Sequence, residues 1–292
     1  MQRTATSAQR ELRYPLNALY DVMVEHANKR PHARGKIAHC CLMDERRTMK
    51  LMEIVSACTI PETNGIDLGA GFGPLAFAFL NAGGRQVYMI EQDAELCLIL
   101  ERIAERLGMQ RQVKVIKLNL RRASILVPEQ VDMVMAKLVI SGLITEPLIS
   151  AIRKTRAITS ADAQYIPESV SSSIRLLDSY RKPVTEKVEY DFIDLRTNRR
   201  NMVNTDLEMR ISCGTMATTV CYTEIESSLG YPNGETTGRF DTLCVPIRRS
   251  IANIGNLLTL QDGTPVDVHV SYKYGASALK SIAIVTPKQR GF

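Results

Sequence analysis

The stretch that decides the fold is Ile66-Asp67-Leu68-Gly69-Ala70-Gly71-Phe72-Gly73-Pro74. Apolar residues run into three glycines at alternate positions, and glycine permits the positive φ angles and the close backbone approach that a ligand-binding turn requires. Pro74 suits the first position of a helix, because the N–H that proline lacks would have no partner there. The pattern therefore predicts a strand, a ligand-binding turn and a helix in direct succession.

Short apolar runs alternate with helical segments around this turn. We expect strands at residues 65–68, 86–90, 113–118 and 131–135, and helices at 75–82 and 94–107. Strands separated by helices of this length pair in parallel, because each crossover returns the chain to the same edge of the sheet. The order predicts a doubly wound, Rossmann-like α/β sheet.

The sequence changes character on either side of this sheet. Before it, apolar residues recur at helical spacing. After Pro167 the chain contains many short β-rich segments separated by turn clusters such as 230–234, which predicts a barrel or a sandwich. We expect an N-terminal helical segment over 1–60, an α/β domain over 61–167 and an all-β, barrel-like domain over 168–292.

Composition limits the class of protein. With 292 residues, 45% apolar and 23% charged, the chain can form a packed core, and general disorder is excluded. The net charge of +6 is far below that of a dedicated nucleic-acid binder, so nucleic acid is not an expected partner. No apolar run reaches the roughly 18–20 residues of a membrane helix. The seven cysteines lack disulfide spacing, and we expect a soluble, cytoplasmic protein without a membrane partner.

Two ligands compete for the glycine turn. A dinucleotide fingerprint would place its third glycine where Pro74 stands, so the match to that pattern is broken. The form D-x-G-x-G-x-G instead resembles the first motif of class I S-adenosylmethionine-dependent methyltransferases. The resemblance implies a turn that passes under the amino-acid portion and the ribose of S-adenosylmethionine. The turn residues assigned to this cofactor are Asp67, Gly69, Ala70, Gly71 and Gly73.

Polar side chains follow the next two predicted strands. Glu91 ends the second strand, and a carboxylate there can accept hydrogen bonds from both ribose hydroxyls. Gln92 follows it directly, and Asn119 follows the third strand, where the family often has a polar contact to the adenine ring. We expect all three to bind the cofactor; a glycine turn beside a solvated glutamate is the alternative.

Four further stretches narrow the resemblance to the protein arginine methyltransferase family. They are residues 42–48, 136–146, 165–168, and 240–259 with 266–270. They follow the order of that family: helical N-terminus, Rossmann-like sheet, Ile-Pro junction and β-barrel. The resemblance implies that Arg47 grips the methionine carboxylate of the cofactor, which suits a guanidinium fork. Asp44 is expected to orient Arg47, unless the two form only a surface ion pair.

The chain departs from the family at its acceptor loop. Two glutamates clamp the guanidinium in that family, and the matching positions hold Lys137 and Glu146. An ammonium would repel a guanidinium by roughly a few kcal/mol where water is scarce. The family's Thr-His-Trp loop is also missing, since the matching stretch is 237–240 and the chain has no Trp. The segment between residues 177 and 187 is too short to contain the family's dimerisation arm. The sequence therefore does not determine the oligomeric state, and a homodimer is one alternative.

We therefore expect an S-adenosylmethionine-dependent methyltransferase that acts on a small, acidic or amino-acid-like molecule rather than on protein arginine. Lys137 is expected to bind an acceptor carboxylate or phosphate, or the cofactor's own carboxylate; a salt bridge to Glu146 is the alternative. Glu146 is expected to position or deprotonate the acceptor, which makes both residues catalytic and substrate-binding candidates. Cys41, where the family has a pocket methionine, is expected to line the substrate site.

Other uses of the same fold stay open. The chain could be a cyclase or lyase that consumes S-adenosylmethionine and releases methylthioadenosine, or a non-catalytic binding protein that keeps the cofactor fold. No metal is expected, because His39, Cys40 and Cys41 lack a second pair of ligands at metal-binding spacing.

Overall fold

Two compact units make up the chain. The computed structural model describes residues 7–29, 35–139, 143–144, 146–214, 217–236, 241–246, 259–275 and 282–287. The first unit, here called the α/β unit, consists of Met1–Leu138, Ala151–Pro167 and Tyr231–Glu235. The second, here called the β unit, consists of Val139–Ser150, Glu168–Gly230 and Thr236–Phe292.

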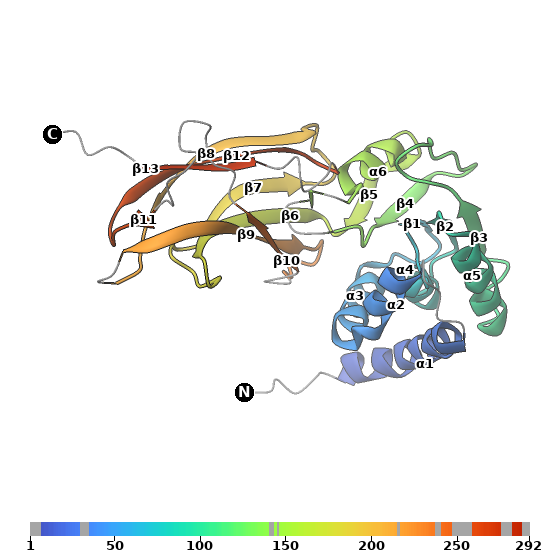
Figure 1. Ribbon diagram of the computed structural model, residues 1–292. Coiled ribbons are helices and arrows are strands. Elements are labelled where there is room, and N and C mark those ends of the chain that lie inside the picture. The colour runs from blue at the N-terminus through green and yellow to red at the C-terminus, as the bar shows by residue number, and fades with distance from the viewer. Residues whose placement is uncertain are drawn as a thin grey trace. The chain divides into compact units, whose positions relative to one another are not determined.

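A parallel sheet forms the centre of the α/β unit (Figure 1). Its strands are β1 (Asn64–Leu68), β2 (Gln86–Glu91), β3 (Val113–Lys117), β4 (Val131–Met135) and β5 (Thr159–Ile166). They lie in the order β3-β2-β1-β4-β5, with β1 in the middle. β1 is buried along its whole length, as expected for a parallel strand covered on both faces. The predicted Rossmann-like sheet is confirmed.

Six helices accompany the sheet in the described part of the chain. They are α1 (Ser7–Lys29), α2 (Lys36–Met43), α3 (Glu45–Cys58), α4 (Pro74–Asn81), α5 (Ala94–Arg106) and α6 (Leu148–Thr155). α4 and α5 pack on β2 and its neighbours, and α1 and α3 pack on α4. α4 buries every side chain from Pro74 to Leu80, because its sequence is apolar all round. No described helix is both long enough and apolar enough to cross a membrane.

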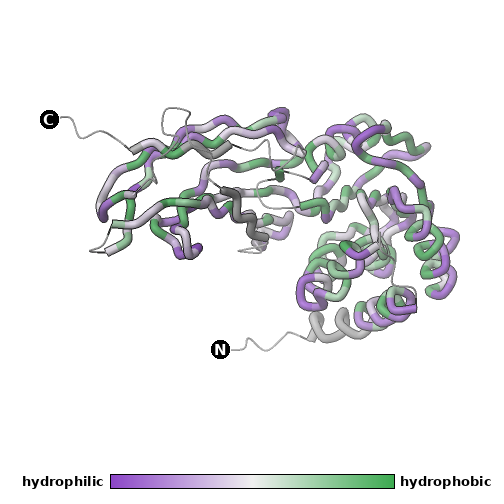
Figure 2. Tube along the Cα trace, in the orientation of Figure 1, coloured by the Kyte–Doolittle hydropathy of each residue, from purple (hydrophilic) through white to green (hydrophobic). Residues whose placement is uncertain are grey.

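The β unit contains antiparallel sheets. One holds β10 (Asp241–Pro246), β9 (Thr218–Gly230), β6 (Ser169–Asp178) and β7 (Val188–Asp194), with β11 (Thr259–Leu260) paired to β9. The other holds β13 (Ile282–Pro287), β12 (Pro265–Lys273) and β8 (Met202–Arg210). Buried and partly exposed residues alternate along most of β6, and Figure 2 shows hydrophobic and hydrophilic residues interleaved along the coloured strands of this unit. The predicted C-terminal β domain is confirmed.

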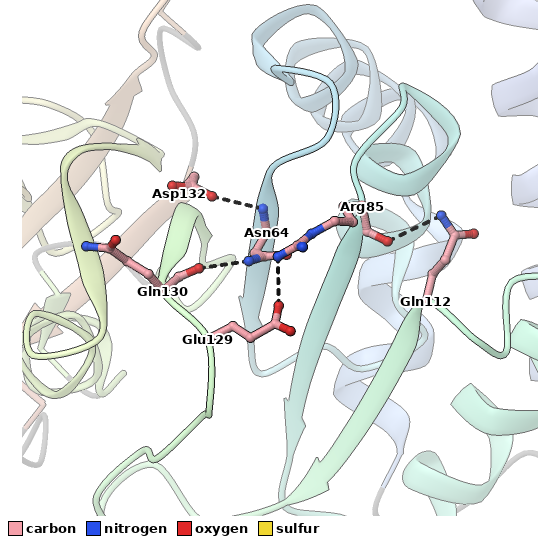
Figure 3. A network of polar contacts seen from close by, with 6 residues as sticks. All are labelled: Asn64, Arg85, Gln112, Glu129, Gln130 and Asp132. Carbon is pink, nitrogen blue, oxygen red and sulfur yellow. Dashed lines mark hydrogen bonds and ion pairs between the residues drawn. The ribbon is translucent and has the colours of Figure 1, made fainter.

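A polar network ties the amino ends of the α/β strands together (Figure 3). Its members are Asn64, Arg85, Gln112, Glu129, Gln130 and Asp132. The Asn64 side chain donates to the Gln130 carbonyl at 3.0 Å and accepts from Arg85 Nε at 3.1 Å, while its backbone N–H donates to Asp132 at 3.0 Å. Asn64 is buried, so these bonds fix how β1 lies beside β2 and β4.

We expect Asn64→Ala to lower the free energy of unfolding by about 1–3 kcal/mol, because it removes both side-chain hydrogen bonds of a buried residue, to the Gln130 carbonyl and from Arg85. Urea denaturation measures this change. Glu129→Gln is the matched control: Glu129 pairs with Arg85 at 2.9 Å, but both side chains are about half exposed, so the loss should stay below about 1 kcal/mol. Equal effects of the two substitutions would contradict this account of the network.

Candidate cofactor-binding site

The glycine turn connects β1 to α4 as the sequence predicts. Gly69, Gly71 and Gly73 have φ angles of 76°, 58° and 79°, which residues with a side chain rarely adopt. The backbone N–H groups of Gly69 and Ala70 donate to the Ile90 carbonyl at 2.9 and 3.0 Å, so the turn runs beside the end of β2. Gly73 is the N-cap of α4, and proline follows it at the first helical position.

Neighbouring side chains leave no room for larger residues at Gly69 and Gly73. A Cβ atom at Gly69 would lie 2.6 Å from Leu138 Cδ2, and one at Gly73 would lie 2.8 Å from Phe77. A Cβ at Gly71 would lie 3.4 Å from Ala38, which shows that α2 lies against the turn. The sequence analysis singled out neither Leu138 nor Ala38, because nothing local marks either residue as a neighbour of the turn.

The Glu91 carboxylate fastens the turn to the end of β2. Its Oε2 accepts from the Gly71 N–H at 2.9 Å, and its Oε1 accepts from the N–H groups of Gln92 and Asp93 at 2.7 and 3.0 Å. Glu91 is only 8% exposed, so these charge-assisted bonds are shielded from water. The sequence predicted a ligand contact for Glu91 but not this role in holding the protein's own backbone.

Gln92 and Asn119 meet at the neighbouring strand ends. Asn119 Nδ2 donates to Gln92 Oε1 at 3.0 Å, and Asn119 Oδ1 accepts from the Arg121 N–H at 2.9 Å. The two side chains come from the loops after β2 and β3, whose carboxyl ends lie at the same edge of the sheet. The structure therefore brings together two residues that the sequence analysis assigned to one cofactor.

Asp67 carries a buried carboxylate oxygen without a partner. The residue is 2% exposed, and its Oδ2 has no hydrogen bond. The pKa of Asp67 is raised to about 7, chiefly by burial and also by the charge of Glu91, although the Ala76 backbone N–H and Lys137 act in the opposite direction. A buried acceptor left unpaired is costly, which makes this oxygen a candidate for binding a ligand donor.

Arg47 and Asp44 meet where α3 begins. Asp44 is the N-cap of α3, and its Oδ1 accepts from the Arg47 N–H at 3.3 Å. Its Oδ2 lies 3.1 Å from Arg47 Nε, so the predicted pairing is present. Asp44 itself lies outside α3, because its backbone leaves the helical conformation at this position.

Lys137 reaches the same region from the loop after β4. Its Nζ donates to the carbonyl of Cys41 on α2 at 3.3 Å. Burial lowers the pKa of Lys137, the positive charge of Arg47 lowers it further, and Cys41, Asp44 and Asp67 raise it. The α/β unit therefore holds five residues that the sequence analysis singled out: Cys41, Asp44, Arg47, Asp67 and Lys137.

Glu146 belongs to the β unit, where its loop is held by the strand end at β12. The Gly275 N–H donates to the Leu143 carbonyl at 2.9 Å, and a Cβ at Gly275 would lie 3.2 Å from the Glu146 carbonyl oxygen. A salt bridge between Glu146 and Lys137 stays a prediction, since the two residues belong to different units. The stretch 237–240, matched above to the Thr-His-Trp loop, lies outside the described residues.

Comparison of the sequence with protein-family models gives no match, and comparison with curated proteins gives none either. Solved structures match over most of the chain. The Trypanosoma brucei PRMT1 enzyme-prozyme heterotetrameric complex with AdoHcy is 12% identical with a TM-score of 0.62, over 84% of this chain and 95% of that chain. A PRMT6 crystal structure is 11% identical with a TM-score of 0.66, over 86% and 99%. The PRMT6-SAH crystal structure is 11% identical with a TM-score of 0.64, over 84% of this chain and 98% of that chain.

Protein arginine methyltransferase 10 of Arabidopsis thaliana, in an open conformation, is also similar, at 11% identity and a TM-score of 0.59, over 75% of this chain and 82% of that chain. At these identities the likeness concerns the fold. The chain has the fold of the protein arginine methyltransferases, in which a class I S-adenosylmethionine-dependent methyltransferase sheet is followed by a β domain. The predicted resemblance to this family is confirmed at that level.

We expect Glu91→Gln to lower the free energy of unfolding of the ligand-free protein by about 1–3 kcal/mol, since an amide presents a donor where backbone N–H groups need an acceptor. Urea denaturation without added nucleoside measures this. Glu105→Gln on the exposed face of α5 is the control and should change stability by less than about 0.5 kcal/mol. Unchanged stability of the Glu91 variant would show that the carboxylate does not fasten the turn.

Asp67 should make stability depend on pH. Its pKa is about 7 in the folded protein against an ordinary 3.8, so the folded state keeps a proton that the unfolded state loses. Stability is then highest below the ordinary pKa and falls as the pH rises through 7. Asp67→Asn lacks this titrating group. The urea midpoint of the variant minus that of the wild type should therefore increase between pH 4 and 8 and stay constant above pH 8. A constant difference across this range would refute the assignment.

Proposed function

We propose that the chain binds S-adenosylmethionine at the glycine turn and transfers its methyl group to a small acceptor molecule. The observation that carries this proposal is the buried Oδ2 of Asp67, which has no hydrogen bond, together with Lys137, whose charge acts on both Asp67 and Arg47. An amino acid head group has an ammonium and a carboxylate on one carbon, and these residues offer an acceptor for the first and cations for the second. Two of the similar structures contain AdoHcy or SAH, which supports the same cofactor class here.

The described residues suit the rest of the cofactor. Glycines at the turn let an adenosyl group approach the backbone closely. A carboxylate has about four lone-pair positions, and three on Glu91 are used by backbone N–H groups. The remaining one, on Oε2, suits a ribose hydroxyl. The Gln92–Asn119 pair is the proposed contact for the edge of the adenine ring.

In methyl transfer from S-adenosylmethionine, the main contribution of the protein is to align the reacting groups. When bound, S-adenosylmethionine supplies a methyl group on a positively charged sulfur that is already a good leaving group. The chain contributes by holding the acceptor in line and by excluding water, which lowers the barrier to group transfer. Glu146 is our candidate for holding the acceptor's amine or hydroxyl and taking its proton as the new bond to the methyl carbon forms.

The acceptor we propose is not protein arginine. Lys137 stands at the position matched to the first acceptor glutamate, and its ammonium would repel a guanidinium. An acidic or amino-acid-like small molecule would not be repelled. The fold supports this change of substrate, because folds are commonly reused with different chemistry in their sites.

The deciding experiment incubates the purified protein with S-adenosylmethionine and pools of amino acids and small organic acids, and identifies the nucleoside released. We expect S-adenosylhomocysteine, formed only when the acceptor is present. Methylthioadenosine as the product would assign a cyclase or lyase instead. No binding of S-adenosylmethionine in calorimetry would leave a non-catalytic role for the fold and overturn the proposal.

Glu146→Gln tests the acceptor side separately. We expect turnover with the identified acceptor to fall roughly 100-fold or more, which is typical for loss of a general base. The dissociation constant of S-adenosylmethionine should stay unchanged, because Glu146 is not among the proposed cofactor contacts. Unchanged turnover would remove Glu146 from the chemistry while leaving the cofactor site in place.

A further inference from the structure

Lys137 directs its charge toward the junction of α2 and α3. Its Nζ donates to the Cys41 carbonyl, which lies in the last turn of α2 and also accepts from Thr48 Oγ1 of α3 at 2.8 Å. Carbonyls at a helix end favour a cation, so this contact suits an ammonium. The head group of Lys137 therefore lies beside the start of α3, where Arg47 is located.

The charges around Lys137 are unevenly matched. Arg47 already has a carboxylate at hand, since its Nε lies 3.1 Å from Asp44 Oδ2. Asp67 also influences Lys137, yet its buried Oδ2 has no hydrogen bond. The ammonium has three N–H donors, and the Cys41 carbonyl accepts one of them. Two cations thus share a partly buried region with one carboxylate that is paired with Arg47 and one, Asp67, that has a buried oxygen without a hydrogen bond.

Two nearby cations repel each other, and a bound anion relieves that repulsion. A ligand that brings a carboxylate between Lys137 and Arg47, and an ammonium to Asp67, would satisfy all three groups at once. The carboxylate and the ammonium must then be close to each other, as they are in an α-amino acid.

We propose that Lys137 and Arg47 together bind the carboxylate of the cofactor's methionine portion, while Asp67 accepts its ammonium. This inference rests on the proposed function and assigns Lys137 to the cofactor instead of the acceptor. Lys137, which stands where the resemblance expects a glutamate, then supplies a second cation, and this cation selects cofactors that have an intact carboxylate.

Decarboxylated S-adenosylmethionine is the probe, because it keeps the sulfonium and the ammonium but lacks the carboxylate. Calorimetry on the full chain measures the dissociation constants of this probe and of S-adenosylmethionine. For the wild type we expect S-adenosylmethionine to bind roughly 10–100-fold more tightly, the range for a charge-assisted contact. Equal affinity for the two compounds would overturn the inference without any variant.

Substitution then isolates Lys137. Lys137→Met should raise the dissociation constant of S-adenosylmethionine about 10-fold or more and leave that of the decarboxylated probe unchanged. Lys137→Arg should retain the preference for S-adenosylmethionine. Lys137→Gln serves as a second neutral variant, and thermal unfolding confirms that each is folded. Lys114→Met removes a charge from an exposed position on β3 and should change neither constant.

The remaining outcomes separate this inference from the proposed function. Unchanged binding of S-adenosylmethionine to a folded Lys137→Met protein, with S-adenosylhomocysteine still formed by the wild type, overturns the role of Lys137 alone. Equal weakening of both compounds shows a structural role and also overturns it. Failure of the wild type to bind either compound removes the proposed function together with the inference.

Discussion

The hydrogen bonds between the Glu91 carboxylate and the backbone of the glycine turn are the constraint on which the rest of the site depends. Three glycines in left-handed conformations have no side chains with which to hold themselves in place. The buried carboxylate at the end of β2 supplies acceptors to Gly71, Gln92 and Asp93, which joins the turn to the neighbouring strand. The strand ends on either side are thereby set at fixed positions along one edge of the sheet.

Near this turn the protein holds charged groups that lack a full set of hydrogen-bonding or opposite-charge partners within the fold. Asp67 is buried with an unpaired oxygen, and Lys137 is held beside Arg47. Such groups lower stability, because burial removes water without supplying a full set of partners. Charges of this kind at a sheet edge where ligands gather are typical of sites tuned for binding.

The fold of the arginine methyltransferases is present in a chain that has a lysine, Lys137, where the sequence comparison above expects a glutamate. The polar contacts at the amino ends of the strands and the buried face of α4 hold the sheet, and neither depends on the residue at position 137. A lysine could therefore replace a glutamate there without disturbing the sheet. This separation of fold from site is consistent with a likeness that extends over most of the chain at only 11–12% identity.

The sequence by itself determined four of the five strands of the parallel sheet, the turn and the order of the two kinds of sheet, whereas β5 was not predicted. Apolar runs, alternate glycines and Pro74 act through local backbone preferences, so predicted and observed elements agree within one residue at most sheet positions. Only the tertiary structure decided that Glu91 holds the turn, that Asp44 caps α3 and that Lys137 meets Cys41, from which it is 96 residues away. Contacts of this kind depend on how distant elements pack, and no local pattern of residues encodes them.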